Sequence, residues 1–170
     1  MRLAGAITAI LLVALAAPAA ALAQIQDHDG QPGVRAGLGS GILYVLDYDS
    51  RGTSLDRAPF ALTSYLTYGL GEALELELGG ILSLEGTRPL ALSGGVRYFF
   101  NPLSFLKLYS TLDAVVPLTP RVDAGLRNED GLQYDVNAHV GVFLGLDLSI
   151  LFARELAAGA GIIVGAQGRY

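Results

Sequence analysis

The 170-residue chain contains no cysteine, which excludes disulfides, thiolate metal sites, thiol catalysis and lipoprotein acylation. After residue 23 it has no uninterrupted apolar run of the roughly eighteen residues that a transmembrane helix needs. With 11 basic against 16 acidic residues it has no basic stripe, so nucleic acid is not an expected partner. The glycine-rich segment 37–41 has the pattern of a strand rather than of a phosphate-binding turn before a helix.

The amino terminus has the organisation of an export signal. Arg2 precedes an apolar run that ends at Pro18, and Ala21-Leu22-Ala23 has the small-residue pattern of a cleavage site. We predict a cleaved signal peptide over 1–23, a flexible lead-in over 24–32 and a single domain over 33–170. Loss of Arg2 with the signal changes the formal net charge from −5 to −6.

From residue 33 onward the chain alternates with a period of two. Even-numbered positions of the predicted strands carry no charged residue, whereas odd-numbered positions carry ten. Leucine follows the even positions almost throughout, with Leu43 as an exception. Because successive side chains of a strand point to opposite sides, one face of the predicted sheet is apolar and the other polar. The sequence therefore predicts an all-β protein with no helical domain.

Turn signals divide the chain into extended segments. The expected strands cover 33–48, 58–70, 74–84, 89–100, 105–116 and 132–144, followed by a less distinct one near 148–153 and a last one ending at Tyr170. Short turns are expected at 71–72, 101–104 and 145–147, and longer loops at 49–57 and 117–131. Single-chain bacterial barrels have even strand numbers. We therefore predict a closed, antiparallel, up-and-down transmembrane β-barrel of eight strands.

A secreted, soluble lipocalin-like barrel is the alternative that shows the same alternation. In that fold the leucine face would be the interior. Two features favour the membrane barrel: the polar face is dominated by glycine and small residues, which suit a narrow lumen, and the aromatics of the leucine face lie at strand ends, as interfacial girdles do. We predict girdle residues Tyr48, Phe60, Tyr134 and Phe152 at the outer end and Tyr68, Tyr98, Phe100 and Tyr170 at the inner end.

The signal peptide, the eight alternating stretches, the short inner turns and the terminal aromatic resemble the small outer-membrane β-barrels of the OmpA/OmpX type. This resemblance implies localisation in the bacterial outer membrane, contact with outer-membrane lipid and recognition of the last strand by the barrel-assembly machinery. In that strand Ile162, Val164, Ala166, Gly168 and Tyr170 occupy the apolar face, with tyrosine where the family usually has phenylalanine.

Charged residues on the odd positions are expected to meet inside the barrel. Centring the turn at 86–88, between the third and fourth expected strands, on Thr87 predicts Glu77 opposite Arg97. A second inward group is predicted in the outer half, where Thr111 would pair with His139 and Asp113 with Asn137. The predicted lumen charge network comprises Arg35, Glu75, Glu77, Arg97, Lys107, Asp113, Asp135, His139 and Arg169. Because an unpaired ion is costly in a narrow lumen, these residues favour a salt-bridged plug over a small channel.

The sequence indicates no catalytic, cofactor or metal site. The hydroxyl residues form no defined triad with His139. We predict a monomeric, non-enzymatic outer-membrane barrel with a structural or surface-interaction role, and a possible extracellular ligand at loops 49–57 and 117–131. A small diffusion pore, a lipid-modifying outer-membrane enzyme and the soluble binding barrel are the alternatives.

Overall fold

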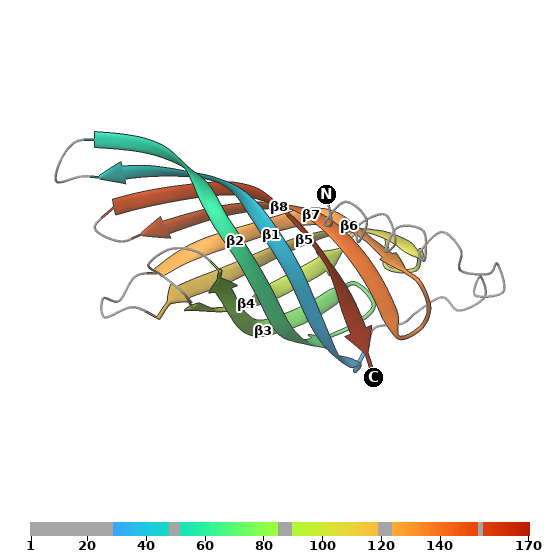
Figure 1. Cartoon of the computed structure of the whole chain (residues 1–170). Helices are drawn as coiled ribbons and strands as arrows, with labels where there is room; N and C mark the ends of the chain where they lie inside the picture. Colours follow the sequence, from blue (N-terminus) through green and yellow to red (C-terminus); the bar gives the residue numbers. More distant parts are fainter. Residues whose placement is uncertain (1–28, 48–51, 85–89, 119–123, 153–154) are drawn as a thin grey trace.

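The computed structural model describes residues 29–47, 52–84, 90–118, 124–152 and 155–170. Eight antiparallel strands form a closed barrel in which each strand pairs with its sequence neighbours and β1 pairs with β8 (Figure 1). This confirms the predicted fold class. The strands are β1 (Pro32–Asp47), β2 (Gly52–Gly69), β3 (Leu74–Ser83), β4 (Leu90–Phe99), β5 (Leu106–Pro117), β6 (Ala124–Asp135), β7 (Val140–Phe152) and β8 (Glu155–Arg169). No helix in these ranges is long and apolar enough to cross a membrane.

Both described ends of the chain and three short turns lie at one end of the barrel, here called the inner end. Tyr170 donates its backbone N–H to the carbonyl of Pro32, and Gly30 donates to Gly69. The predicted turn at 71–72 is present, and Gly71 has a φ of 151° that glycine adopts without strain. The opposite end, called the outer end, carries the connections at 48–51, 85–89, 119–123 and 153–154, which lie outside the described residues.

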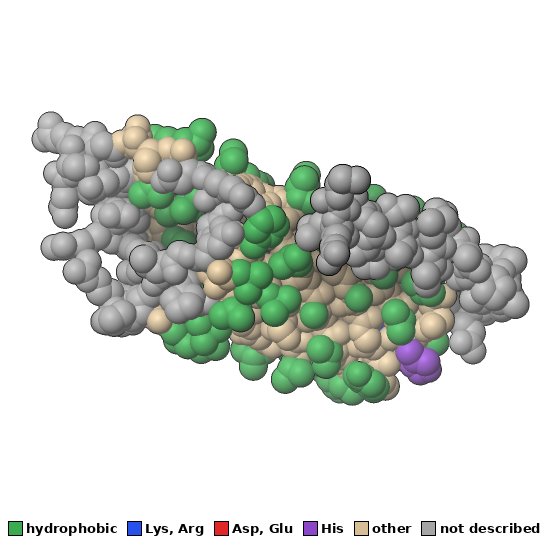
Figure 2. Space-filling model, in the orientation of Figure 1, with side chains coloured by type: hydrophobic (Ala, Val, Ile, Leu, Met, Phe, Trp, Pro, Cys, Tyr) green, Lys and Arg blue, Asp and Glu red, His purple; other side chains and the backbone are tan. Residues whose placement is uncertain are grey.

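The even-numbered apolar residues point outward, as the alternation predicts. Leu66, Leu78 and Leu146 are each more than 60% exposed, whereas Arg35, Arg97 and Asp113 are 0% exposed. In the space-filling view, hydrophobic side chains are spread over the described part of the visible wall, with backbone and other side chains between them (Figure 2). A soluble barrel would have the reverse arrangement, because exposed leucine and buried charge both cost free energy in water. The lipocalin-like alternative is therefore wrong for this chain.

Strands β6 and β7 differ from the prediction. The expected loop 117–131 and strand 132–144 are replaced by β6, which already begins at Ala124, and by a turn at 136–139. In that turn the Asn137 side chain accepts backbone hydrogen bonds from His139 (2.8 Å) and Val140 (2.9 Å). An asparagine turn of this kind needs neither glycine nor proline. The predicted turn at 145–147 lies instead within β7.

Strand β2 also extends further than predicted and absorbs most of the expected loop 49–57. Its register with β1 shifts between Gly39, which pairs with Ala61, and Gly41, which pairs with Ala58. This irregularity places one extra residue in β2, and Pro59, which has no backbone N–H, lies inside it. Beyond the bulge the outward positions become odd, so that Leu55 is 67% exposed.

One group of polar residues lies on the outward face of β5 and β6. Asn128 donates from its side-chain amide to the carbonyl of Thr111 (2.7 Å) and to the Ser110 hydroxyl (3.2 Å). Asp130, opposite Ser110 in the register, is exposed, and Asn128 lies 3.5 Å from its carboxylate. Asp130 lies four residues from Tyr134 along β6. Because the strands are tilted against the barrel axis, this separates the two residues by about 10 Å along that axis. Even positions carry no charge in the predicted strands, which did not include 117–131. Because this segment is largely strand, Asp130 is a charged residue at an even, outward position.

The predicted girdle residues fall mainly at the inner end. Tyr68, Tyr98, Phe100 and Tyr170 are exposed there. Tyr134, predicted at the outer end, lies at the inner end because β6 ends at Asp135, and its ring packs edge-to-face on Phe105 with centroids 5.8 Å apart. At the outer end Phe152 is exposed at the end of β7, and Phe60 lies beside the end of β3, where its carbonyl accepts from Leu84. Tyr48 lies outside the described residues.

Candidate functional site

The lumen of the barrel holds a network of charged side chains that come from seven of the eight strands, all except β2. Five cations face five buried carboxylates: Arg35, Arg97, Lys107, Arg127 and Arg169 against Glu75, Glu77, Asp113, Glu129 and Asp135. All ten are at most 8% exposed. A sixth carboxylate, Asp147, borders the network on its outer side with 30% of its side chain exposed. We call these eleven residues the lumen network.

At the inner end the network is centred on Asp135. Lys107 Nζ lies 2.7 Å from one carboxylate oxygen of Asp135, and Arg169 Nη1 lies 3.2 Å from the other. Arg169 also reaches Glu75 at 3.5 Å. The two cations therefore share Asp135 of β6, and Arg169 connects it to Glu75 of β3.

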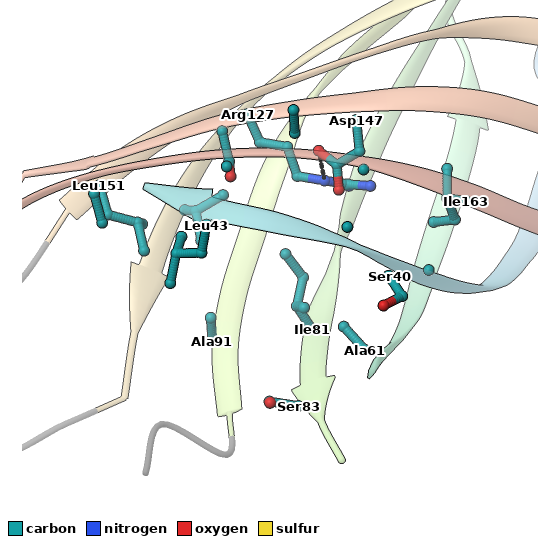
Figure 3. Close-up of a pocket in the computed structure, with 18 of the residues that line it drawn as sticks. Ser40, Leu43, Ala61, Ile81, Ser83, Ala91, Arg127, Asp147, Leu151 and Ile163 are labelled. Carbon is teal, nitrogen blue, oxygen red and sulfur yellow. Dashed lines mark hydrogen bonds and ion pairs between the residues drawn. The ribbon is translucent and has the colours of Figure 1, made fainter. Parts of the chain in front are cut away.

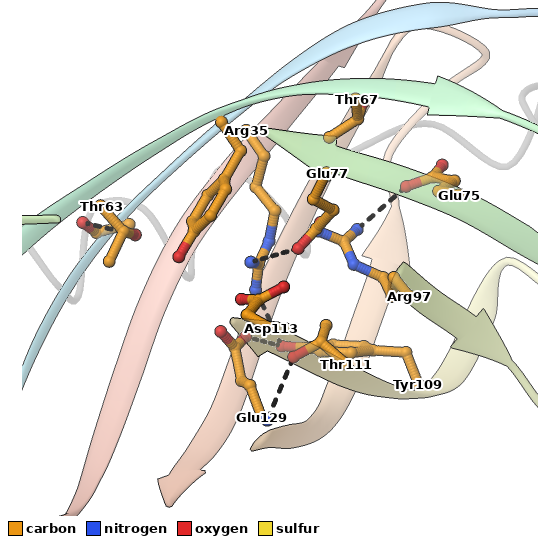
Figure 4. Close-up of polar contacts among 12 residues, drawn as sticks. Arg35, Thr63, Thr67, Glu75, Glu77, Arg97, Tyr109, Thr111, Asp113 and Glu129 are labelled. Atoms are coloured by element: carbon orange, nitrogen blue, oxygen red, sulfur yellow. Dashed lines mark hydrogen bonds and ion pairs between the residues drawn. The ribbon is translucent and has the colours of Figure 1, made fainter. Parts of the chain in front are cut away.

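The middle of the network is built on Arg97, whose guanidinium spans the lumen from β4. It pairs with Glu75 at 3.3 Å and with Glu77, both on β3 (Figure 4). It also donates to the side-chain oxygens of Gln167 (2.7 Å) on β8 and Gln133 (3.2 Å) on β6. This single side chain thus connects four strands of the wall.

Arg35, from β1, connects the middle of the network to its outer part. It pairs with Glu77 at 3.6 Å and forms a hydrogen-bonded ion pair with Glu129. Its guanidinium carbon lies 3.9 Å from the ring centroid of Phe143, a favourable cation–π distance. The Tyr109 hydroxyl donates to Glu129 at 2.5 Å. Phe99, Tyr109, Phe143 and Ile163 form the buried apolar cluster around these charges.

On the outer side Arg127 meets three carboxylates. Its guanidinium lies 2.9 Å from Glu129, 3.0 Å from Asp147 and 3.5 Å from Asp113. It also donates to the Tyr65 hydroxyl at 2.6 Å. Asp113 lies on β5, Glu129 on β6 and Asp147 on β7, so that Arg127 joins these three strands.

The structure brings together eight of the nine residues predicted for the network and separates His139 from them. His139 lies in the exposed inner turn, with its Nδ1 3.2 Å from the backbone oxygen of Arg169. The predicted second group in the outer half is therefore wrong: Asp135 and Asn137 lie at the inner end, and Thr111 pairs with Glu129 and Asp113 with Arg127. The connection between β5 and β6 covers only 118–123 instead of the predicted loop 117–131, and this shifts all of these partners.

The predicted pairing of Glu77 with Arg97 is wrong in register by two residues. Arg97 pairs with Glu75 across the strands, and Glu77 pairs with Gly95. The long arginine side chain nevertheless reaches both carboxylates. A long flexible side chain tolerates such a shift of two residues along one face.

Sequence reasoning missed Arg127, Glu129 and Asp147, and the polar bridges Gln133 and Gln167. Residues 127 and 129 fall in the predicted loop 117–131, although their odd numbering matches the inward face of the other strands. The signal that identifies them is the alternation of apolar and polar residues, which continues through 124–135. The cluster Asn128-Glu129-Asp130-Gly131 has the composition of a turn, and this composition concealed the strand.

Comparison with solved structures shows the same fold. Neisserial surface protein A is 12% identical with a TM-score of 0.57, covering 82% of this chain and 97% of that one. The outer membrane protein OprG from Pseudomonas aeruginosa is 14% identical, with a TM-score of 0.55 and coverages of 85% and 98%. Ail, the attachment invasion locus protein of Yersinia pestis, is 15% identical, with a TM-score of 0.51 and coverages of 84% and 99%.

No family model and no curated protein matches the sequence. At these identities the structural likeness establishes the architecture alone. Together with the closed ring of eight strands and the outward leucines, it shows that this chain has the fold of the small eight-stranded outer-membrane β-barrels, as the resemblance to the OmpA/OmpX type implied.

Proposed function

We propose that this protein is a non-enzymatic, integral protein of the bacterial outer membrane whose lumen is closed by the lumen network. The observation that carries the proposal is the burial of ten charged side chains that enter the lumen from six of the eight strands. Each of these charges has an opposite partner within 4 Å. Moving an ion past them requires these pairs to separate in a narrow, weakly hydrated space, which costs several kcal/mol per ion.

The outward apolar wall supports membrane residence, since such a surface is stable only against lipid. Two of the solved structures with the same fold are, by name, a surface protein and an outer membrane protein. A rigid barrel of this kind presents its outer connections to the exterior, and we propose a structural or surface-contact role there. The expected ligand loops are short: of 49–57 and 117–131, only 49–51 and 118–123 lie between strands.

The test is conductance of the purified protein in a planar lipid bilayer. The closed lumen predicts no stepwise conductance from the wild-type barrel. A reproducible unit conductance that changes in Glu77→Gln or Arg97→Ala would instead establish a pore controlled by the network. Correct folding is checked beforehand by heat-modifiable migration in gels, which a closed membrane barrel shows.

Membrane residence is tested separately by fractionation of cells that express the full chain. We expect the protein in the outer-membrane fraction and in solution only with detergent. A folded protein that remains soluble without detergent would contradict the proposal whatever its conductance.

A further inference from the structure

A cavity of about 640 Å³ lies in the outer half of the lumen, above the lumen network (Figure 3). This volume lies within the range typical of sites for small organic molecules. Its lining comes from β1, β2, β3, β4, β5, β6, β7 and β8 together. It is therefore an internal chamber of the barrel rather than a groove on the outer wall.

The walls of the cavity are mainly apolar. Leu43, Val45, Ile81, Val115, Leu151 and Ile163 line it. All six occupy odd, inward positions, where a water-filled lumen normally has polar side chains. These six side chains offer water no polar partner. An apolar guest gains free energy by covering these walls.

The floor of the cavity is the ion pair between Arg127 and Asp147, whose closest atoms are 3.0 Å apart. The Arg127 side chain is 2% exposed and is already bonded to Glu129 and Tyr65. The Asp147 side chain is 30% exposed, whereas the other paired carboxylates of the network are at most 5% exposed. Asp147 is therefore the carboxylate of the network that a guest in the cavity can reach.

The charge balance at this level is negative. Among the described side chains, Arg127 faces three carboxylates, and only Glu129 of these has a second cation, Arg35. A bound cation would therefore balance the excess negative charge of this floor. A protonated amine can donate to Asp147 without displacing Arg127, because ammonium has three donors and the carboxylate has further lone pairs.

We infer that the outer cavity binds amphiphilic amines, with the apolar body against the walls and the ammonium group on Asp147. This inference goes beyond the closed lumen of the proposed function and does not depend on it. The chamber lies on the outer side of the network, with which it shares Arg127 and Asp147, and a barrel that conducts would still contain it.

Methyl NMR of the full chain in detergent micelles tests the inference, with n-hexylamine as the probe. The δ1 methyls of Ile81 and Ile163 report the cavity, and the outward Ile150 reports partition of the probe into detergent. We expect saturable shifts of the Ile81 and Ile163 methyls that Ile150 does not share. Hexylamine should bind more tightly than n-hexanol, and hexanoate should bind most weakly.

Two variants separate the contributions of charge and shape. Asp147→Asn should reduce hexylamine affinity about tenfold, to that of hexanol, because a charge-assisted hydrogen bond is lost. Val115→Phe should narrow the cavity and weaken binding of both probes. Asp130→Asn makes the same change of charge on the outward face and serves as the control, with affinity unchanged. Folding of each variant is checked by heat-modifiable migration.

Either of two results would overturn the inference. One is that the cavity methyls shift no more than that of Ile150. The other is that Asp147→Asn binds hexylamine as tightly as the wild type. Neither result bears on the conductance expected of the barrel. Failure of the amine-binding inference is therefore distinguishable from failure of the closed-lumen proposal.

Discussion

Replacing Arg97 with methionine removes the cation that connects four strands inside the barrel while retaining most of the side-chain volume. In the wild type Arg97 is 0% exposed and pairs with Glu75 and Glu77. It also donates to Gln133 and Gln167. The variant leaves these four partners in a lumen from which water is largely excluded.

Removing one partner of a buried ion pair usually costs about 3–5 kcal/mol, because the other charge is left uncompensated. Here both carboxylates keep a second cation: Arg35 lies 3.6 Å from Glu77, and Arg169 lies 3.5 Å from Glu75. The cost should therefore lie near the lower limit. We expect Arg97→Met to lower the free energy of unfolding by about 3 kcal/mol.

The assay is urea unfolding in phospholipid vesicles, with the folded fraction measured from heat-modifiable gel migration. Adding Glu77→Gln to Arg97→Met should restore part of the loss, because one unpaired charge is removed along with its partner. Val96→Ala changes the neighbouring, half-exposed outward residue and should cost about 1 kcal/mol or less. A loss below about 1 kcal/mol in Arg97→Met, or a double variant less stable than the single one, would refute the reasoning.

Two further predictions concern the wall of the barrel. Asp130→Leu should stabilise the protein in vesicles by about 1–2 kcal/mol, since a charge in the lipid-facing band is removed; urea midpoints measure this, and an unchanged or lower midpoint would show that Asp130 does not face lipid. Gly95→Ala should prevent folding or lower stability by more than about 2 kcal/mol, because the new Cβ would lie 2.0 Å from the carbonyl oxygen of Leu112. Gly94→Ala is the control, with its nearest contact 3.3 Å away at a flexible Leu78 methyl, and equal effects of the two alanines would contradict the structure.

The fold could be predicted from the sequence because it depends on a local property. Alternation fixes which side chains share a face, and the exclusion of charge from one face identifies that face as the lipid side. For this reason the inward positions of Arg35, Glu75 and Arg97 followed from parity alone. Four of the first five strands, and β2 from residue 58 onward, were correctly located because glycine, proline or asparagine marks the turns between them.

The ends of β6 and β7 were decided by contacts that are distant in sequence. The segment around Glu129 has a turn-like composition, yet it is extended because Arg35 of β1 and Tyr109 of β5 bind the Glu129 carboxylate. The Asn128 amide, in turn, is bonded to β5. These partners are 94, 20 and 17 residues away, and no local pattern indicates them.

Register was the other property that only the closed barrel determined. Parity alone does not distinguish Glu75 from Glu77 as the partner of Arg97, because both lie on the same face two residues apart. The choice depends on where each turn closes and on the requirement that β8 meet β1 in register. The sequence alone placed eight of the eleven charges of the lumen network inside the barrel. The tertiary structure decided which of them meet and that an apolar chamber remains above them, because closure fixes the level of every side chain along the barrel.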